Sequence, residues 1–330
     1  MSSKFSDVDE YGFQRPADFD YGSYEEIMSE YLKVLTRRQM QWEKYMRSHE
    51  LTMSRALKRY VRKGVPAHLR GIVWMKTSGA SAARASAPSL YRNLLFEQHD
   101  EDVVDMIKID LPRTFPNNIF FPDVQSQLFN ILVAYAHLNK DVGYCQGLNY
   151  IAGLLLIVTK DEEGTFWLLR HIVEVIAPNY HTKSMSGLIV DIGVLNELLK
   201  VRVPDVHAHT KMLGLPWAVI VTKWFICLFA EVLPTETVLR IWDCLFAEGY
   251  KILFRVSVTL IMRHRDTLMA TEDISQLANV FREMLQSAMV TNCHEFMSSI
   301  FTIPGNIRRR DIESLRTQVV VQEDIKGVIC

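Results

Sequence analysis

The sequence predicts an all-α fold, and three observations support this prediction. Proline is absent between Pro122 and Pro178 and again between Pro234 and Pro304, so long helices can run there without interruption. Apolar residues recur at the 3.6-residue period of amphipathic helices. Sustained strand alternation and the Asn-Gly or Asp-Gly turns of hairpins are missing.

The expected helices follow one another along the chain. Residues 1–20 are expected to be loosely ordered, and a long amphipathic helix follows them with Ser23 and Glu26 as its capping box. Residues 64–66, with the sequence Gly-Val-Pro, are expected to interrupt the helical pattern. Residues 78–89 are expected to form a loop or a weak helix. The apolar period then places helices at 123–138, 148–158, 162–176, 189–199, 216–232, 235–247 and 252–265. Thr271 is the expected cap of a further helix, and a charged helix follows residues 304–306.

Charge is balanced over the chain but locally concentrated. The 37 Lys and Arg residues against 38 Asp and Glu give a formal net charge of −1, which argues against a nucleic-acid protein held by bulk charge. Residues 55–63 are nevertheless basic, through Arg55, Lys58, Arg59, Arg62 and Lys63. This stretch is either a solvated helix face or a surface for an acidic protein or an anionic lipid.

Composition and cysteine spacing limit the class of protein. The chain has 330 residues, of which 48% are hydrophobic and 23% charged, so it can bury a large core without a disulfide or a metal. Its five cysteines show no CxxC spacing, which argues against a disulfide framework and a cysteine-based zinc site. His207 and His209 point to different sides of an expected helix, so we expect no metal site.

Two apolar runs test for a membrane span. Residues 151–158 are too few, whereas residues 215–233 are long enough but include Lys223 near their centre and Glu231 near their end. A central Lys costs about 2.5–3.5 kcal/mol on insertion scales. We therefore expect a buried helix and no transmembrane segment. The polar start of the chain also lacks the apolar core of a signal peptide.

The motifs of several enzyme classes are absent. The chain lacks the phosphate loop GxxxxGK(S/T), HExxH, GxGxxG and GxSxG, so it has no nucleotide cradle of these kinds. Residues 143–147 have the form GxCxG, a cysteine version of a nucleophile elbow centred on Cys145. That elbow requires a buried strand before it, and residues 138–142 are polar. Hydrolase chemistry at Cys145 is therefore disfavoured.

Two short motifs stand out. Arg113 lies between Pro112 and Pro116, so its backbone is restricted, and Asp110 is close enough in sequence to hold its guanidinium. Gln146 is flanked by glycines at the start of an apolar helix, so it projects from a tight turn. From the residues alone, these motifs indicate a surface ion pair and a hydrogen-bonded helix start.

The two motifs together resemble those of the TBC domain, the GTPase-activating domain that acts on Rab GTPases. Its IxxDxxR motif stands here as Ile107, Asp110 and Arg113, and its YxQG motif as Tyr144, Gln146 and Gly147. The resemblance continues in residues 64–74 and 239–249, and it covers about residues 64–270 with the order of the blocks intact. The outer blocks contribute Arg70, Trp74, Trp242 and Asp243.

The resemblance implies a multi-helix all-α TBC core at 64–270, an N-terminal extension at 1–63 with an amphipathic helix, and a C-terminal helical extension at 271–330. It implies that Arg113 is an arginine finger and Gln146 a glutamine finger that positions water, both acting in trans. Asp110 would orient Arg113, and Tyr144 and Gly147 would shape the turn. Arg70, Trp74, Trp242 and Asp243 would support the fold.

The implied protein is a regulator that supplies catalytic residues to a partner GTPase, and is not itself the GTPase. Its partner would be a GTP-loaded Rab, which carries the GTP and Mg²⁺, so no cofactor of its own is expected. We expect a cytoplasmic protein without nucleic acid, peripheral on endomembranes through the Rab. Two alternatives remain: a non-catalytic Rab-binding module that uses the same face, and a cysteine hydrolase built on Cys145.

Overall fold

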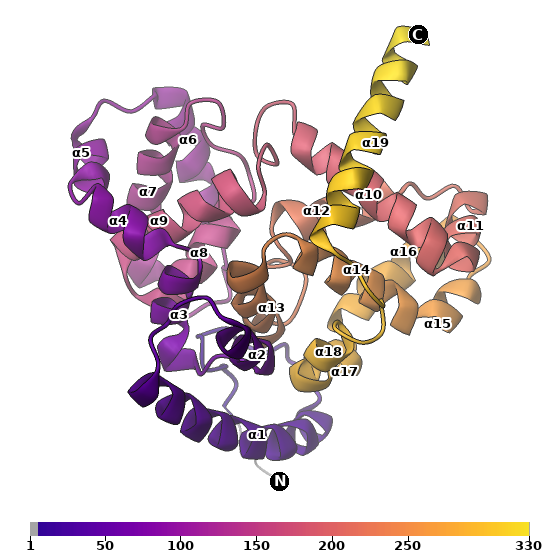
Figure 1. Cartoon of the computed structure of the whole chain (residues 1–330), viewed down its shortest axis with the longest axis horizontal. Coiled ribbons are helices and arrows are strands. Elements are labelled where there is room, and N and C mark those ends of the chain that lie inside the picture. The colour runs from indigo at the N-terminus through magenta and orange to yellow at the C-terminus, as the bar shows by residue number, and fades with distance from the viewer. Residues whose placement is uncertain (1–5, 330) are drawn as a thin grey trace. The chain divides into compact units, whose positions relative to one another are not determined.

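The computed structural model describes residues 6–329, and side-chain surroundings through residue 321. The prediction of an all-α fold is confirmed, because this part of the chain forms helices and turns with two isolated β-bridges and no strand. The helices form two compact units, Met1–Glu174 and Val175–Cys330 (Figure 1). The division into 1–63, 64–270 and 271–330 stays a prediction.

The first unit is built around one apolar helix. It contains α1 (Tyr21–Ser48), α2 (Arg55–Lys63), η1 (Ala67–Leu69), α3 (Arg70–Thr77), α4 (Ala80–Ser86), α5 (Leu90–Phe96), α6 (Glu101–Asp110), η2 (Leu111–Arg113), α7 (Phe121–Leu138), α8 (Leu148–Thr159) and α9 (Glu162–His171). Helix α8 packs against α3, α7 and α9. Its residues from Ile151 to Ile157 are all buried, which explains the continuous apolar run in the sequence.

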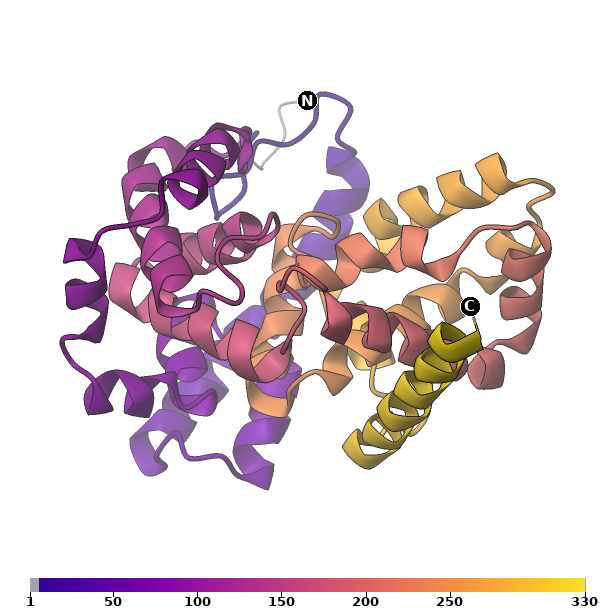
Figure 2. The same cartoon turned by 90° about the horizontal axis from the view of Figure 1, so that it is seen from above.

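The second unit packs its helices around α10 and α14. After a π-helical turn at Ile172–Ile176, it contains α10 (Ser186–Arg202), α11 (Pro204–Met212), α12 (Trp217–Ile226), α13 (Thr235–Glu248), α14 (Lys251–Arg263), α15 (Arg265–Met269), α16 (Ile274–Glu283), η4 (Met284–Gln286), α17 (Ala288–Thr291), α18 (Cys293–Ser299) and α19 (Arg309–Ile329). Helix α19 packs on α10 (Figures 1 and 2). Arg316 of α19 forms a two-pronged ion pair with buried Asp191 of α10, at 2.7 Å for each bond.

Two expected helix caps need correction. The cap of α1 is Asp20, whose side chain accepts from Ser23 N, and the cap of α16 is Asp273 instead of Thr271. Thr271 is buried and donates to the carbonyl of Leu268 at 2.7 Å. Residues 78–89, expected to form a loop or a weak helix, contain the seven-residue helix α4, which is held on α9 because Arg84 pairs with Asp161 and Glu163.

The helix expected at 216–232 ends at Ile226. Leu228 and Phe229 have φ angles of 49° and 66°, so the backbone leaves the helical region there. The indole N–H of Trp242 donates to the carbonyl of Leu228 at 2.9 Å, which fixes the turn. Within the described residues, none of the helices is long and apolar enough to cross a membrane.

The expectation of loose order at 1–20 is wrong for residues 6–20, and residues 1–5 lie outside the described part. Tyr11 is buried, and Asn118 Nδ2 donates to its carbonyl at 2.9 Å. Ile119 N donates to the carbonyl of Gly12 at 2.8 Å. Gly12 has a φ of 91°, which strains a residue with a Cβ, and a Cβ there would lie 2.4 Å from the ring of Phe120, which would have to move. The start of the chain is therefore docked beside the segment that precedes α7.

Candidate functional site

The arginine motif lies where α6 ends. Helix α6 closes at Asp110, and the following turn, Leu111–Arg113, is a 3₁₀ helix with Pro112 near its start. The Asp110 side chain is 5% exposed and that of Arg113 is 52% exposed. Arg113 Nε donates to Asp110 Oδ1 at 2.7 Å, and Nη2 contacts the same oxygen. The predicted contact between these two residues is confirmed. The buried carboxylate holds the guanidinium, which remains about half exposed.

The glutamine motif reaches the same carboxylate. Tyr144 donates its phenolic O–H to Asp110 Oδ2 at 2.6 Å. Burial, together with this hydrogen bond, raises the pKa of Tyr144 well above its usual value, so the phenol stays protonated and donates. The hydrogen bond to Asp110 likewise raises the pKa of Arg113. Asp110 therefore joins the two motifs, one through each carboxylate oxygen.

A second connection runs through two residues that the sequence analysis did not single out. Thr114 Oγ1 donates to the carbonyl of Asp110 at 2.7 Å and accepts from Asn149 Nδ2 at 2.7 Å. Asn149 Oδ1 then accepts from Gly147 N at 2.9 Å. Thr114 and Asn149 are both fully buried. The signal in the sequence is an Asn inside an otherwise apolar helix, because a buried amide needs partners.

Gln146 is the exposed residue of its turn. It lies in the turn that precedes α8, followed by Gly147 with a φ of 114°. Its position between Cys145 and a glycine keeps it off the packed face of α8, as predicted. Its side chain faces solvent and carries both a carbonyl acceptor and an amide donor. The turn therefore presents a neutral hydrogen-bonding group beside the Asp110 network.

Cys145 is a poor nucleophile in this setting. Burial and the negative charge of Asp110 raise the pKa of its thiol, which disfavours the thiolate. The segment before it consists of the end of α7 and turns, so the strand required by a nucleophile elbow is not there. Both observations count against the hydrolase alternative.

Residues 6–20 pack against the segment that follows the turn at Leu111–Arg113. The ring of Phe13 meets that of Phe115 edge to face, with centroids 5.1 Å apart. Phe115 in turn contacts the ring of Tyr150 at 5.3 Å. The hydroxyl of Tyr150 lies 3.4 Å from the carbonyl oxygen of Arg113. The backbone of the arginine turn is thus packed against aromatic side chains from residues 6–20 and from α8.

The four residues of the outer blocks are buried. Arg70 Nη1 donates to the hydroxyl of Tyr11 at 2.6 Å, and Trp74 is fully buried on the same helix. In the second unit, Trp242 fixes the turn at Leu228, and buried Asp243 lies 3.9 Å from Arg240 Nε. Their burial favours the structural role expected for them.

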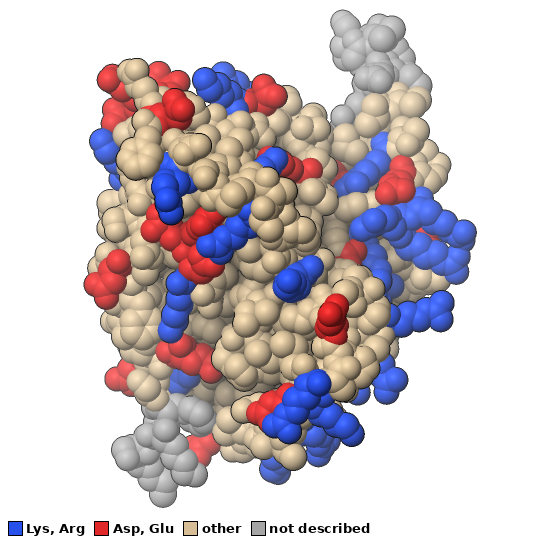
Figure 3. All heavy atoms as spheres, turned by 60° about the vertical axis from the view of Figure 1, so that its left-hand side comes forward, with Lys and Arg blue, Asp and Glu red and all other residues tan. Residues whose placement is uncertain are grey.

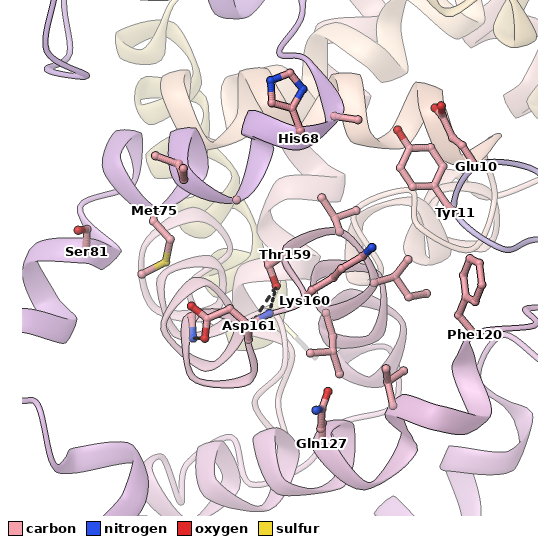
Figure 4. A pocket seen from close by; sticks show the side chains of 18 of the residues that line it. Glu10, Tyr11, His68, Met75, Ser81, Phe120, Gln127, Thr159, Lys160 and Asp161 are labelled. Carbon is pink, nitrogen blue, oxygen red and sulfur yellow. Dashed lines mark hydrogen bonds between the residues drawn. The ribbon is translucent and has the colours of Figure 1, made fainter. Parts of the chain in front are cut away.

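A large cavity lies elsewhere in the first unit. Its volume is about 1020 Å³, and Figure 4 shows its lining from the start of the chain, α3, α7 and the connection after α8. Tyr11, Met75 and Phe120 are among the lining residues, whereas Arg113 and Gln146 are not. No group of three or more His, Cys, Asp or Glu suited to a metal occurs in the part of the chain that the structure covers.

Comparison with known proteins agrees with this fold. The family model of the Rab-GTPase-TBC domain matches residues 67–269. Growth hormone-regulated TBC protein 1-A of Danio rerio is 46% identical over 96% of this chain and 92% of its own length. Growth hormone-regulated TBC protein 1 of Homo sapiens is 44% identical over 95% of each chain.

Solved structures give the same result. The crystal structure of the Chlamydomonas flagellar RabGAP TBC domain superposes with a TM-score of 0.77 at 31% identity, covering 89% of this chain and 99% of that one. The Ypt/Rab-GAP domain of Gyp1p superposes with a TM-score of 0.69 at 20% identity, covering 81% of this chain and 97% of that one, which supports the fold alone. The chain belongs to the Rab-GTPase-TBC domain family.

Proposed function

We propose that this chain accelerates GTP hydrolysis on a Rab-family GTPase by inserting Arg113 and Gln146 in trans. Membership of the family supports a Rab GTPase-activating role. The observation that carries the finer proposal is the shared Asp110 carboxylate, which holds the Arg113 turn at one oxygen and the Gln146 turn at the other. The two turns that carry these exposed side chains are thereby joined through one carboxylate.

Arg113 has the chemistry to stabilise the transition state. Phosphoryl transfer spreads negative charge over the transferring group and its leaving oxygen, and an inserted arginine stabilises that charge. Asp110 contacts Nε and Nη2, so Nη1 lies on the edge that a phosphate would meet. The guanidinium is planar and always charged, so Asp110 can hold it in a fixed orientation before the partner binds. An arginine finger is worth about 10³–10⁵ in rate.

Gln146 has the chemistry to position the attacking water. A glutamine can accept from the water through its carbonyl and donate through its amide to a neighbouring backbone. Ras-like GTPases carry such a glutamine themselves, and here it would come from the activator. The GTP and Mg²⁺ would be those of the Rab. We infer that the chain contributes side chains alone and binds neither by itself.

Single-turnover GTP hydrolysis across a Rab panel tests the proposal. Arg113→Ala and Gln146→Ala should each lose most of the acceleration, whereas Cys145→Ala should keep it. Wild-type protein that binds a Rab without accelerating hydrolysis would establish the non-catalytic binding module instead. Loss of activity in Cys145→Ala alone would support the cysteine hydrolase.

A further inference from the structure

Helices α1 and α2 carry a concentrated positive charge that has no role in the proposed function. Residues 33–63 contain ten Lys and Arg residues and two Glu residues, a formal net charge of +8. Because the whole chain has a net charge of −1, the remaining residues together carry −9. The positive charge of the protein is thus concentrated in its second tenth, on two neighbouring helices of the first unit.

The cations of α1 form a stripe on its outer face. The buried face of α1 is made by Tyr31, Arg38, Trp42 and Tyr45. The opposite face, at alternating spacings of four and three residues, carries Lys33, Arg37, Met40, Lys44 and Arg47, all exposed. This stripe runs for about 21 Å at the rise of an α-helix.

Helix α2 repeats the arrangement on a shorter scale. It buries Leu57 and Val61, and its outer side carries Arg55, Arg59 and Lys63, all exposed. Arg55 and Arg59 are one helical turn apart, as are Arg59 and Lys63, so they lie along one side of the helix. On both helices, the basic side is exposed and does not pack against the rest of the protein.

An aromatic cluster fixes the two helices together. The ring of Tyr60 lies 5.8 Å from that of Trp42 and 4.7 Å from that of Tyr45. The indole N–H of Trp42 donates to the carbonyl of Gly64 at 2.9 Å, just after α2 ends. These contacts hold the backbones of the two helices next to each other, so their basic sides belong to one surface.

The two basic sides meet at a groove. This groove, of about 430 Å³, is lined by Lys44 of α1 and by Arg59 and Lys63 of α2, over the rings of Tyr45 and Tyr60. The structure shows no ion pair to these three cations among its described residues. In Figure 3, Lys and Arg side chains gather along the lower edge of the molecule, the height at which Figure 1 places α1.

We propose that the outer face of α1 and α2 docks onto a membrane that contains anionic lipids, with a phosphate headgroup in the groove of Lys44, Arg59 and Lys63. Clusters of four to eight Lys and Arg on a helical surface suit anionic lipid headgroups. An extended stripe matches a planar field of charge better than it matches a compact acidic protein. Met40 of the stripe, which is 67% exposed, adds an apolar side chain that can enter the headgroup layer.

The contact would be electrostatic and shallow. The apolar face of α1 is already packed on the protein, so the helix cannot bury it in lipid as an interfacial amphipathic helix does. Each cation near an anionic surface is worth about fivefold in binding, so removing three should weaken binding roughly 100-fold. Binding should also fall with added salt, since the charges are exposed. The inference does not depend on the activity proposed above.

Sedimentation of the full chain with vesicles tests this proposal. The vesicles contain phosphatidylcholine alone, phosphatidylcholine with phosphatidylserine, or phosphatidylcholine with a phosphatidylinositol bisphosphate. Wild type should bind both anionic mixtures and not the neutral one. The triple variant Lys44→Gln, Arg59→Gln and Lys63→Gln should lose binding roughly 100-fold, on the same basis of about fivefold per cation.

A matched control removes the same charge elsewhere. Lys183→Gln, Lys211→Gln and Arg282→Gln change three exposed cations of the second unit. This control should bind anionic vesicles nearly as wild type does, and both triple variants should keep wild-type hydrolysis rates with a soluble Rab. Equal losses in the two triple variants, or no loss in the groove variant, would overturn the proposal. So would a groove variant that loses binding to a soluble polyglutamate peptide while it still binds vesicles.

Discussion

Tyr144 and Arg113 are bound to opposite oxygens of one buried carboxylate, at 2.6 Å and 2.7 Å from Asp110. The two residues are 31 positions apart and belong to different turns. Their geometry is therefore coupled, because displacement of the carboxylate from one donor alters its contact with the other.

Tyr144→Phe should slow hydrolysis about tenfold while leaving Rab binding nearly intact. The change removes one hydrogen bond to a charged group, worth about 1.5–3 kcal/mol, and leaves Asp110 with fewer donors. Tyr91→Phe is the matched control, because its hydroxyl also donates to a carboxylate, Glu162 Oε1 at 2.6 Å, that is not part of the Asp110 network. Single-turnover hydrolysis and Rab affinity are measured for both. Equal effects of the two variants would contradict the role given to Tyr144.

Arg113→Lys should lose nearly as much activity as Arg113→Ala and should not change the thermal midpoint. A lysine is a point charge on a flexible stem, so it cannot contact Asp110 and a phosphate together along a planar fork. The Arg113 side chain is 52% exposed, and exposed ion pairs contribute little to stability. Hydrolysis rates and thermal unfolding of the three proteins check this. Activity of Arg113→Lys close to wild type would show that charge alone suffices.

Much of this site could be expected from local sequence. Asp110 and Arg113 are three positions apart at a helix end, so their contact follows from local geometry. Helix α7 lies within two residues of its predicted bounds because its apolar period is strong. The contact of Tyr144 with Asp110, by contrast, spans 34 positions and depends on how α7 returns the chain. No local pattern specifies such a contact.

The errors have a common physical origin. Ser23 satisfies the capping pattern, but the acceptor is the side chain of Asp20, three positions earlier. The sequence pattern alone cannot decide between two candidate caps that lie so close together. The helix expected at 216–232 has the right apolar content, yet contact of Trp242 with the carbonyl of Leu228 favours a turn. The docking of residues 6–20 likewise depends on Asn118, far along the chain. Tertiary contacts decide these cases.

His181 should make the protein less stable as pH falls from about 6.5 to about 4. Burial lowers the pKa of His181 to about 4, its Nε2 lies 2.9 Å from the carbonyl of Ile226, and its buried Nδ1 has no partner. The unfolded chain therefore binds more protons than the folded one in this window, so stability rises with pH there. The full effect is on the order of 3 kcal/mol at 1.36 kcal/mol per pH unit.

Chemical denaturation across this pH range measures the effect of His181. His181→Gln keeps a donor for Ile226 but does not titrate, so its stability should change less between pH 6.5 and 4 than that of wild type. Parallel pH profiles of the two proteins would show that another group causes the acid sensitivity.

Phe13→Ala should reduce the hydrolysis rate severalfold with a small change in stability. The variant removes an edge-to-face contact with Phe115, and such pairs contribute about 0.5–1.5 kcal/mol beyond their buried area. Phe115 contacts Tyr150, whose hydroxyl lies near the carbonyl of Arg113. A more mobile Phe115 ring should therefore disturb the position of Arg113 more than it lowers the stability of the fold. Phe19→Ala is the control, since that ring contacts Tyr21 and Tyr24 instead. A larger rate loss in Phe19→Ala would contradict this support.

Gly147→Ala should abolish most of the acceleration, whereas Gly143→Ala should keep a large part of it. Both glycines have positive φ, but the two values differ, at 56° for Gly143 and 114° for Gly147. Gly143 has a φ of 56°, in the region of positive φ, and a Cβ there would have nothing within 4 Å. An alanine in that region costs roughly 1–2 kcal/mol and displaces no neighbour.

Gly147 has a φ of 114° and a ψ of −34°, outside the regions open to residues with a Cβ. An alanine would have to change the backbone, and that change would break the 2.9 Å hydrogen bond from Gly147 N to Asn149. Gln146 precedes this bond directly, so its side chain would be redirected while Arg113 stays in place. Hydrolysis assays on both variants, with circular dichroism to establish folding, measure the difference. Similar losses for the two folded variants would mean that the turn acts through flexibility and not through the direction in which it holds Gln146.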